Sequence, residues 1–341
     1  MSLTLHKTDV NFSWNYSNST KMLKLEKPLL AGHQTSHATH VQGILGFLRE
    51  WVNYPSFEKP DPCVQGSWIA GGNIDHRAKQ RWILGLLDEY EGVYPHIKDM
   101  VKGISSKSAA EINAFLKKEG FDIQLNEWVD PYMFGAASVF RLLVNWKKPG
   151  KTGFNVRDEY PAFQINQKNQ GLLFSQIEGE EYPTLIIPTS DDDTFLFIHP
   201  RAEHVGDVQK THELSKVIAH LKPDLSHEYD TAVIPCVDLD VKPDVNWLTG
   251  IARSGAGASV GSQLMQVKQQ VRAKMNHEGA FVESATAGAM RLTAFVQQPK
   301  VFVVDQPFYM VFVKSINRRP VPLATIRVGT DHWKDPGELH S

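Results

Sequence analysis

The sequence has few cysteines, no excess of charge of either sign and no long apolar run. Its two cysteines, Cys63 and Cys236, make neither a disulfide framework nor a zinc set, so we expect buried thiols and no metal site. A formal net charge of −2 gives no electrostatic reason to expect nucleic acid or an anionic membrane as partner. No apolar stretch approaches the roughly 20 residues that a bilayer-spanning helix needs.

An export signal is also missing, because Met1 is not followed by a charged and then apolar stretch. This favours an intracellular protein. The opposite expectation comes from three N-x-S/T triplets at Asn11, Asn15 and Asn18, which a secreted protein would offer for glycosylation. Tracts rich in Asn, Ser and Thr form such triplets by chance, so an intracellular location is the preferred expectation.

Helical periodicity in the first third of the chain gives way to strand alternation in the remainder. After an irregular arm over 1–35, we expect helices at His40–Val52, His76–Tyr90, Ser108–Lys118 and His212–Leu221. The predicted strands are Phe121–Leu125, Ser138–Trp146, Ala162–Gln167, Gly171–Ile177, Thr184–Pro188, Thr194–Pro200 and Thr231–Lys242. Segregated helices and strands predict an α+β fold, and with no Pro/Gly/Ser linker we expect one domain over 1–341.

The most informative stretch is Leu264–Asp305. Its first part alternates apolar with polar side chains and predicts a long strand over Leu264–Met275, interrupted only by Gln269. About twenty residues rich in Ala, Ser, Thr and Val follow as far as Pro299, and loops of that length in a compact domain are usually functional. A second strand is predicted from Val301 onward.

These residues resemble the serpin family. The motifs His277-Glu278-Gly279-Ala280, Ser284-Ala285-Thr286 and Asp305-Gln306-Pro307-Phe308 are similar to the serpin hinge, reactive loop and following strand. Pro322–Val328 with Asp335-Pro336 resembles the last strand and its end, and Ser138–Pro149 resembles the central strand that ends in a Trp, here Trp146. The resemblance covers roughly residues 137–336. It implies a serpin-like α+β fold with three β-sheets, peripheral helices and an exposed reactive-centre loop at 277–299.

Serpins inhibit proteases as suicide substrates: the protease cuts the loop, and the loop then inserts into the main sheet as a new strand. The resemblance implies a reactive bond at Thr293–Ala294, or at Leu292–Thr293 in a loop one residue shorter. It also implies a sheet opening at Trp146 and a hinge formed by Glu278, Gly279, Ala280, Val282, Ser284 and Thr286. The expected partner is a serine or cysteine protease of elastase-like or chymotrypsin-like preference. The protein itself would be a monomer, without cofactor and without enzymatic activity.

The loop can be tested for its fitness as an inserted strand. If alternate residues from Ala280 to Leu292 point inward, the buried set is uncharged, while Glu283 and Arg291 both point outward. The opposite register would bury both charges at several kcal/mol each. The alternation therefore favours insertion.

Two departures from the serpin pattern support a second interpretation. His277 stands where an acidic residue is usual, and Phe281-Val282-Glu283 replaces a run of small residues. Bulky or charged residues there mark family members that do not inhibit. The alternative is a non-inhibitory serpin-fold protein that serves as a binding or structural module.

A third interpretation comes from Gly257-Ala258-Ser259-Val260-Gly261, which matches the nucleophile elbow of α/β-hydrolases with Asp305 and His332 following in order. The elbow requires a helix directly afterwards, whereas a strand is predicted here, so the hydrolase is the least favoured interpretation. The same glycines lack the following helix that a nucleotide site needs. Asp191-Asp192-Asp193 is predicted to be a polar turn and no cation site.

Overall fold

The protein is described by a computed structural model covering residues 36, 38–52, 68–129, 135–224, 228–253, 262–280 and 300–339. Its helices are α1 (Val41–Val52), α2 (Arg77–Gly85), α3 (Leu87–Ile97), α4 (Ala109–Lys118), α5 (Gln167–Gln170) and α6 (Val208–Ala219). Short 3-10 turns are η2 (Ile74–His76), η3 (Lys98–Met100), η4 (Asn246–Leu248) and η5 (Thr330–His332). Within these ranges no helix is both long and apolar enough to cross a bilayer.

The described strands form five hydrogen-bonded sheets. The largest contains β18 (Arg319–Val328), β17 (Phe308–Ile316), β9 (Thr194–Pro200), β8 (Thr184–Pro188) and β7 (Leu173–Ser175). A second contains β16 (Val301–Val303), β10 (Thr231–Pro235), β6 (Tyr160–Asn166) and β5 (Lys151–Val156). A third contains β11 (Val237–Val241), β14 (Val271–Met275), β15 (Gly279–Ala280) and β4 (Val144–Asn145). The smaller sheets are β2 (Val101–Ser106) with β3 (Gly135–Phe140), and β1 (Trp68–Ile69) with β12 (Ala252–Arg253) and β13 (Ser262–Gln263).

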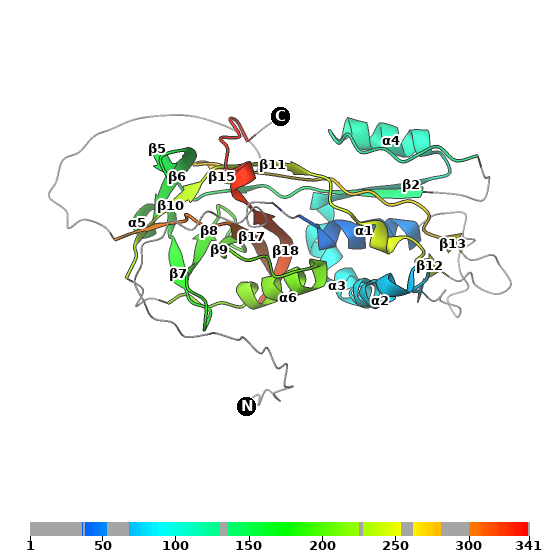
Figure 1. Cartoon of the computed structure of the whole chain (residues 1–341), viewed down its shortest axis with the longest axis horizontal. Helices are drawn as coiled ribbons and strands as arrows, with labels where there is room; N and C mark the ends of the chain where they lie inside the picture. The colour runs from blue at the N-terminus through cyan, green and yellow to red at the C-terminus, as the bar shows by residue number, and fades with distance from the viewer. Residues whose placement is uncertain are drawn as a thin grey trace, which may run out of the picture.

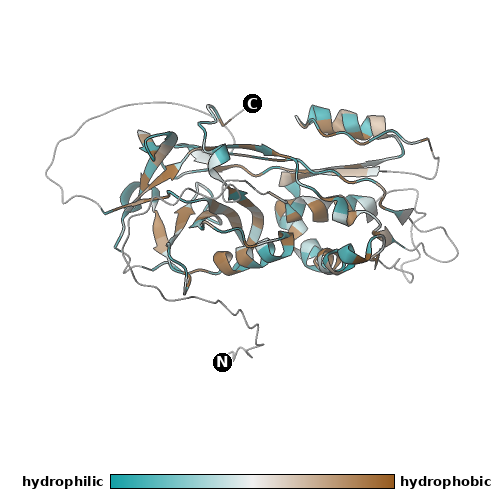
Figure 2. Cartoon of the chain, viewed as in Figure 1, coloured by the Kyte–Doolittle hydropathy of each residue, from teal (hydrophilic) through white to brown (hydrophobic). Residues whose placement is uncertain are grey.

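The pair β2–β3 lies between helices. In Figure 1, α4 lies on one side of β2 and α1 on the other, with α2 and α3 beyond α1. The helix α1 buries the apolar side chains of Ile44, Leu45 and Leu48, which share one face at helical spacing. Figure 2 shows the same pattern: the helices carry both colours, whereas β17 is largely brown, as expected of a strand buried on both faces.

The predicted α+β class is confirmed by the described helices and sheets. The predicted strands Thr184–Pro188 and Thr194–Pro200 agree with β8 and β9. The helix predicted at Ser108–Lys118 is α4. It begins at the predicted N-cap, where the Ser108 hydroxyl accepts from the Glu111 amide at 3.3 Å, and it is followed by Gly120 with φ +81°.

Several predicted elements are wrong in their extent. The strand expected over Ser138–Trp146 is divided between β3 and β4, which join different sheets. The helix expected over His76–Tyr90 is divided at Leu86 between α2 and α3. The strand expected over Thr231–Lys242 is divided at Cys236, because β10 and β11 join different sheets. The strand expected from Val301 onward is likewise two strands, β16 and β17, in two sheets. Alternation in a sequence reports local geometry and carries no information about which sheet a strand joins.

Two predicted strands have no strand partner over much of their length. Only Val271–Met275 of the predicted strand Leu264–Met275 pairs within its sheet, and Phe121–Leu125 is extended but unpaired. The alternation is confirmed over Val271–Met275, where Val271, Ala273 and Met275 are buried, and it is wrong before that, since Met265 is 58% exposed whereas Gln270 is buried. The ladder of backbone hydrogen bonds is missing before Val271 because an opening separates this part of the chain from β3.

Candidate functional site

The candidate site is a seam between the β2–β3 pair and the sheet of β11, β14, β15 and β4. One edge is β3 followed by β4, and the other is the extended chain 264–270 followed by β14. At one end of the seam, which we call the upper end, the edges are joined by β15, which pairs with β14 on one side and with β4 on the other. Below β15, none of the described pairings joins β3 to residues 264–270. Six residues of β3 make this unpaired part about 20 Å long at ~3.3 Å per residue.

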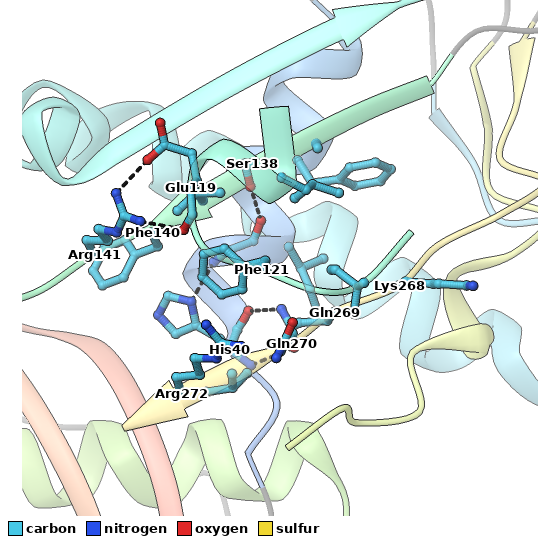
Figure 3. A pocket seen from close by; sticks show the side chains of 18 of the residues that line it. His40, Glu119, Phe121, Ser138, Phe140, Arg141, Lys268, Gln269, Gln270 and Arg272 are labelled. Atoms are coloured by element: carbon cyan, nitrogen blue, oxygen red, sulfur yellow. Dashed lines mark hydrogen bonds and ion pairs between the residues drawn. The ribbon is translucent and has the colours of Figure 1, made fainter. Parts of the chain in front are cut away.

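The seam holds a cavity of about 710 Å³. Its floor is apolar and comes from α1 and from the large sheet behind, as Ile44, Phe47, Phe312 and Ile326 show. Polar side chains form much of its rim, and Figure 3 shows several of them facing a common space. A volume of this size lies within the range of binding pockets for small ligands or short segments.

Gln269 connects the seam to the start of α1. Its Oε1 accepts from the His40 amide at 2.9 Å, and its Nε2 donates to the His40 carbonyl at 3.0 Å (Figure 3). Gln269, which interrupts the apolar face of the predicted strand, therefore uses its side-chain amide to bind two backbone groups of His40. These bonds take the place of the strand partner that residue 269 lacks.

His40 lies within the cavity wall against Phe140, with ring centroids 4.5 Å apart. Its Nε2 lies 3.0 Å from the Leu323 carbonyl, and its Nδ1 accepts from the Gly43 amide at 3.2 Å. Nε2 therefore carries the proton of a neutral ring. Burial lowers the pKa of His40 to about 4, against which the Leu323 hydrogen bond acts only in part.

Residues 119–126, which we name the strap, run along the edge formed by residues 266–272. The Gln270 Oε1 accepts from the Asp122 amide at 3.1 Å. Farther along, Gln266 accepts from the Asn126 amide at 2.9 Å and donates to its carbonyl at 3.2 Å. Side-chain amides thus provide the hydrogen bonds that a neighbouring strand would otherwise provide. The strap is a polar cover attached to one edge of the seam.

Charged groups reinforce the same attachment. Arg272 donates to the Gly120 carbonyl and pairs with Asp240 of β11 at 2.7 Å. Lys242 pairs with Asp122 at 2.7 Å. Hydrogen bonding to Lys242 lowers the pKa of Asp122, so this carboxylate is charged at neutral pH. The pairs are exposed, and each contributes little alone.

The first residue of the strap is attached to the opposite edge. The Glu119 carboxylate, with only 8% of its side chain exposed, binds Lys102 of β2 at 3.0 Å and also Arg141 just after β3. Arg141 donates in addition to the Glu119 carbonyl. Burial disfavours the charged form, but the two cations outweigh it and hold the pKa of Glu119 below its ordinary value. The strap is therefore fastened on both sides of the seam.

The upper end of the seam is closed by a hinge turn, Asn276–Gly279. The turn brings Ala280 between Met275 and Val144, where Ala280 is fully buried. This is the inward orientation that the sequence alternation assigns to Ala280. A side chain at Gly279 would place its Cβ 2.4 Å from the Val144 carbonyl oxygen, so close approach of the two backbones requires glycine here.

Trp146 packs beside this turn with 4% of its surface exposed. Its indole Nε1 donates to the Asn276 carbonyl at 3.1 Å, and its amide donates to the Glu278 carbonyl at 3.0 Å. The ring stacks on Phe163 at 6.3 Å between centroids. Trp146 is thus packed in the core, and it lies where β15 enters the sheet.

The structure brings four predicted site residues together, namely Trp146, Glu278, Gly279 and Ala280. The remaining predicted positions lie outside the described residues: Val282, Ser284, Thr286, Leu292, Thr293 and Ala294. The arm 1–35, with the Asn11, Asn15 and Asn18 triplets, and Cys63 lie outside them as well. Cys236 is buried as expected, and burial raises the pKa of its thiol to about 12.

The other sequence candidates do not converge on a site. Ser259 lies outside the described residues, and the chain resumes at Ser262 as β13 where a hydrolase requires a helix. His332 contacts Ser36 at 2.8 Å and Asp331 at 3.0 Å. Asp192 and Asp193 pair with Lys147 and Lys314, and nowhere in the described ranges do three potential metal ligands gather.

Sequence reasoning missed the strap and the role of His40. Gln269 was a visible signal, since an amide within an apolar stripe needs a buried partner. The alternation of Leu264–Met275 places Gln266 and Gln270 on the polar face of the predicted strand. Their contacts, 140 and 148 residues away along the chain, have no local signature.

No family model and no curated protein matches the chain. Solved structures similar to it include a serpin from Schistosoma mansoni, at 12% identity and TM-score 0.46, covering 85% of this chain and 99% of that one. Thyroxine-binding globulin in complex with thyroxine is similar at 10% identity and TM-score 0.46, covering 85% and 98%. The human thyroxine-binding globulin complex has 10% identity and TM-score 0.47, covering 84% and 96%. Activity does not follow from likeness at this level.

Proposed function

We propose that the chain is a protease inhibitor that traps its target by inserting the cleaved loop into the seam. The observation that supports this most directly is the position of Gly279 and Ala280. They already occupy the upper end of the seam as β15, between two edges that stay unpaired below. Continued in the same direction, residues after Ala280 would extend β15 into the cavity.

The chemistry of the seam suits an inserted strand. Residues 265–270 lack a strand partner among the described pairings, and the cavity floor is apolar. About fourteen inserted residues would form on the order of ten ladder hydrogen bonds at ~1 kcal/mol net each. A strand of that length would carry a protease attached at Thr293 about 45 Å, at ~3.3 Å per residue. Such a displacement would separate the acyl-enzyme from its normal geometry.

The test is incubation with an elastase-like and a chymotrypsin-like protease, followed by denaturing electrophoresis. We expect an adduct that survives detergent, with the loop cut at Thr293–Ala294 or at Leu292–Thr293. Ala280→Arg places a charge on the inward face, so the variant should be cleaved as a substrate without forming an adduct. An Ala280→Arg variant that inhibits as well as the parent contradicts the proposal.

The strap favours a second candidate, a non-inhibitory binding or structural protein of the same fold. Glu119 and Arg272 fasten the strap to both edges of the seam, and insertion must displace it. The bulky Phe281 and the charged Glu283, which follow the hinge turn, also disfavour insertion of the loop. Cleavage of the loop without adduct, by every protease of either class, would favour this candidate.

A further inference from the structure

The segment Trp333–Leu339 packs against the hinge turn after the last strand has ended. Trp333 is 1% exposed and stacks on Phe308 at 6.1 Å, with Tyr160 edge-on at 5.2 Å. Leu339, at the other end, is also 1% exposed although the residues around it are polar. The segment is therefore anchored by buried apolar side chains at both ends.

Between these anchors the backbone of the segment binds the hinge turn. The Gly337 carbonyl accepts from Asn276 Nδ2 at 3.1 Å, and the Glu338 carbonyl accepts from Lys274 Nζ at 3.5 Å. Gly337 has φ +64°, and its amide donates to Asp335 Oδ1 at 2.9 Å. This left-handed turn, which favours glycine, directs the carbonyl toward the hinge.

Asn276 uses all of its polar groups at this junction. Its amide donates to the Gly279 carbonyl at 3.0 Å, and its carbonyl accepts from Trp146 at 3.1 Å. Its side-chain Oδ1 accepts from the Glu278 amide at 2.8 Å, which leaves Nδ2 for Gly337. Because Asn276 is 4% exposed, loss of Gly337 would strand a buried donor, at about 1–3 kcal/mol.

We infer that residues 335–339 are a latch that holds the hinge turn closed and thereby keeps Gly279 and Ala280 in the sheet. Release of the latch frees the Asn276 side chain, weakens the turn and lets β15 separate from β4. A segment far from the loop in sequence thus sets how firmly the first loop residues are held. The consequence for inhibition rests on the proposed function, whereas the coupling between latch and hinge does not.

Amide hydrogen exchange tests the coupling without any protease. The reporter amides are those of Trp146, Gly150 and Asn276, which donate to carbonyls of the hinge turn, and the amides of β17 report global opening. Two variants release the latch: one chain ends after Lys334 and so retains Trp333, and the other is Leu339→Asp. We expect the reporter amides to exchange at least tenfold faster in both, with β17 unchanged.

A synthetic peptide of residues 335–341, added to the shortened chain, should slow the reporter amides again. Unchanged reporter amides in Leu339→Asp overturn the inference, and so does acceleration of the reporter and β17 amides by a common factor, which reports global unfolding. The protease experiment is a separate arm. If the parent forms no adduct, the proposed function fails while the exchange result stands. If the parent forms an adduct but the reporter amides are unchanged in Leu339→Asp, only the inference about the latch fails.

Discussion

Gln269 and His40 exchange two hydrogen bonds across the floor of the seam, one in each direction, at 2.9 and 3.0 Å. Gln269→Leu would complete the apolar stripe of the predicted strand, but it would leave the His40 amide without its partner and the His40 carbonyl with only the Ile44 amide at 3.2 Å. We expect the free energy of unfolding to fall by about 1–3 kcal/mol in urea denaturation. Gln263→Leu, at an exposed position, is the matched control, and a Gln269→Leu protein as stable as its parent would contradict this role.

Acidification should destabilise the protein through three histidines that lie within its packed interior or cavity wall. Burial lowers the pKa of His40, His199 and His212 to about 4 from an ordinary value of 6.5. The unfolded chain therefore binds protons that the folded chain excludes. Their contribution to stability is complete above pH ~6.5 and is lost as the pH falls from 6.5 toward 4.

Each of these histidines gives a slope of at most about 1.4 kcal/mol per pH unit. His40→Phe should have a shallower dependence of the unfolding free energy on pH in this window, whatever its stability at pH 7. His96→Gln, at an exposed site, should retain the slope of the parent. Denaturant unfolding at several pH values measures both, and equal slopes for His40→Phe and the parent would exclude His40 as a contributor.

The strap should loosen when its attachment to the β2–β3 edge is removed. Glu119→Gln keeps the shape of the side chain but removes the charge that Lys102 and Arg141 share. We expect a loss of about 1.5–3 kcal/mol in unfolding free energy, together with faster exchange of the Asp122 and Asn126 amides. Glu127→Gln is the exposed control. Parental exchange at both amides would show that the strap is held from one edge only.

Gly279→Ala should displace β15 from β4. The new Cβ would lie 2.4 Å from a backbone oxygen, Val144 O, which cannot rotate away as a side chain does. We expect a cost of about 1–3 kcal/mol and loss of protection at the Trp146 amide. Gly85→Ala, with no atom near the added Cβ, should be neutral or slightly stabilising.

Cleavage of the loop should raise the melting temperature if the seam accepts it. On the order of ten new ladder hydrogen bonds at ~1 kcal/mol each correspond to a rise of about 10 °C or more. Calorimetry before and after limited proteolysis within 281–299 measures the shift. The control is the Ala280→Arg protein, whose nicked form should show no rise over its own intact form. No rise in the parent would remove the insertion step.

The local features of this fold were predictable where neighbours in sequence decide them. The Ser108 cap and the bounds of β8 and β9 depend on nearby residues, and the sequence predicted them correctly. Sheet membership depends on distant partners. The chain therefore changes sheet at Cys236 without any break in its alternation that would reveal it.

The candidate site divides in the same way. The hinge residues Gly279 and Ala280 were found through a motif and an alternation, both of which are local. The strap was expected to be a strand because Phe121, Ile123 and Leu125 alternate with polar residues, yet its partners are side chains and not a backbone ladder. Sequence alternation does not distinguish an extended segment with a strand neighbour from one held by glutamine side chains.

That the strap is held by side chains has a consequence for how such a protein can vary. A strand within a ladder is held by backbone hydrogen bonds, which every substitution except proline leaves in place, so the strength of its attachment changes little from one sequence to the next. Here Gln266, Gln270 and Arg272 contribute separable increments, and each codon alters one of them. The free energy needed to displace the strap is thus a heritable quantity that selection can raise or lower in small steps, while the fold beneath the strap is preserved.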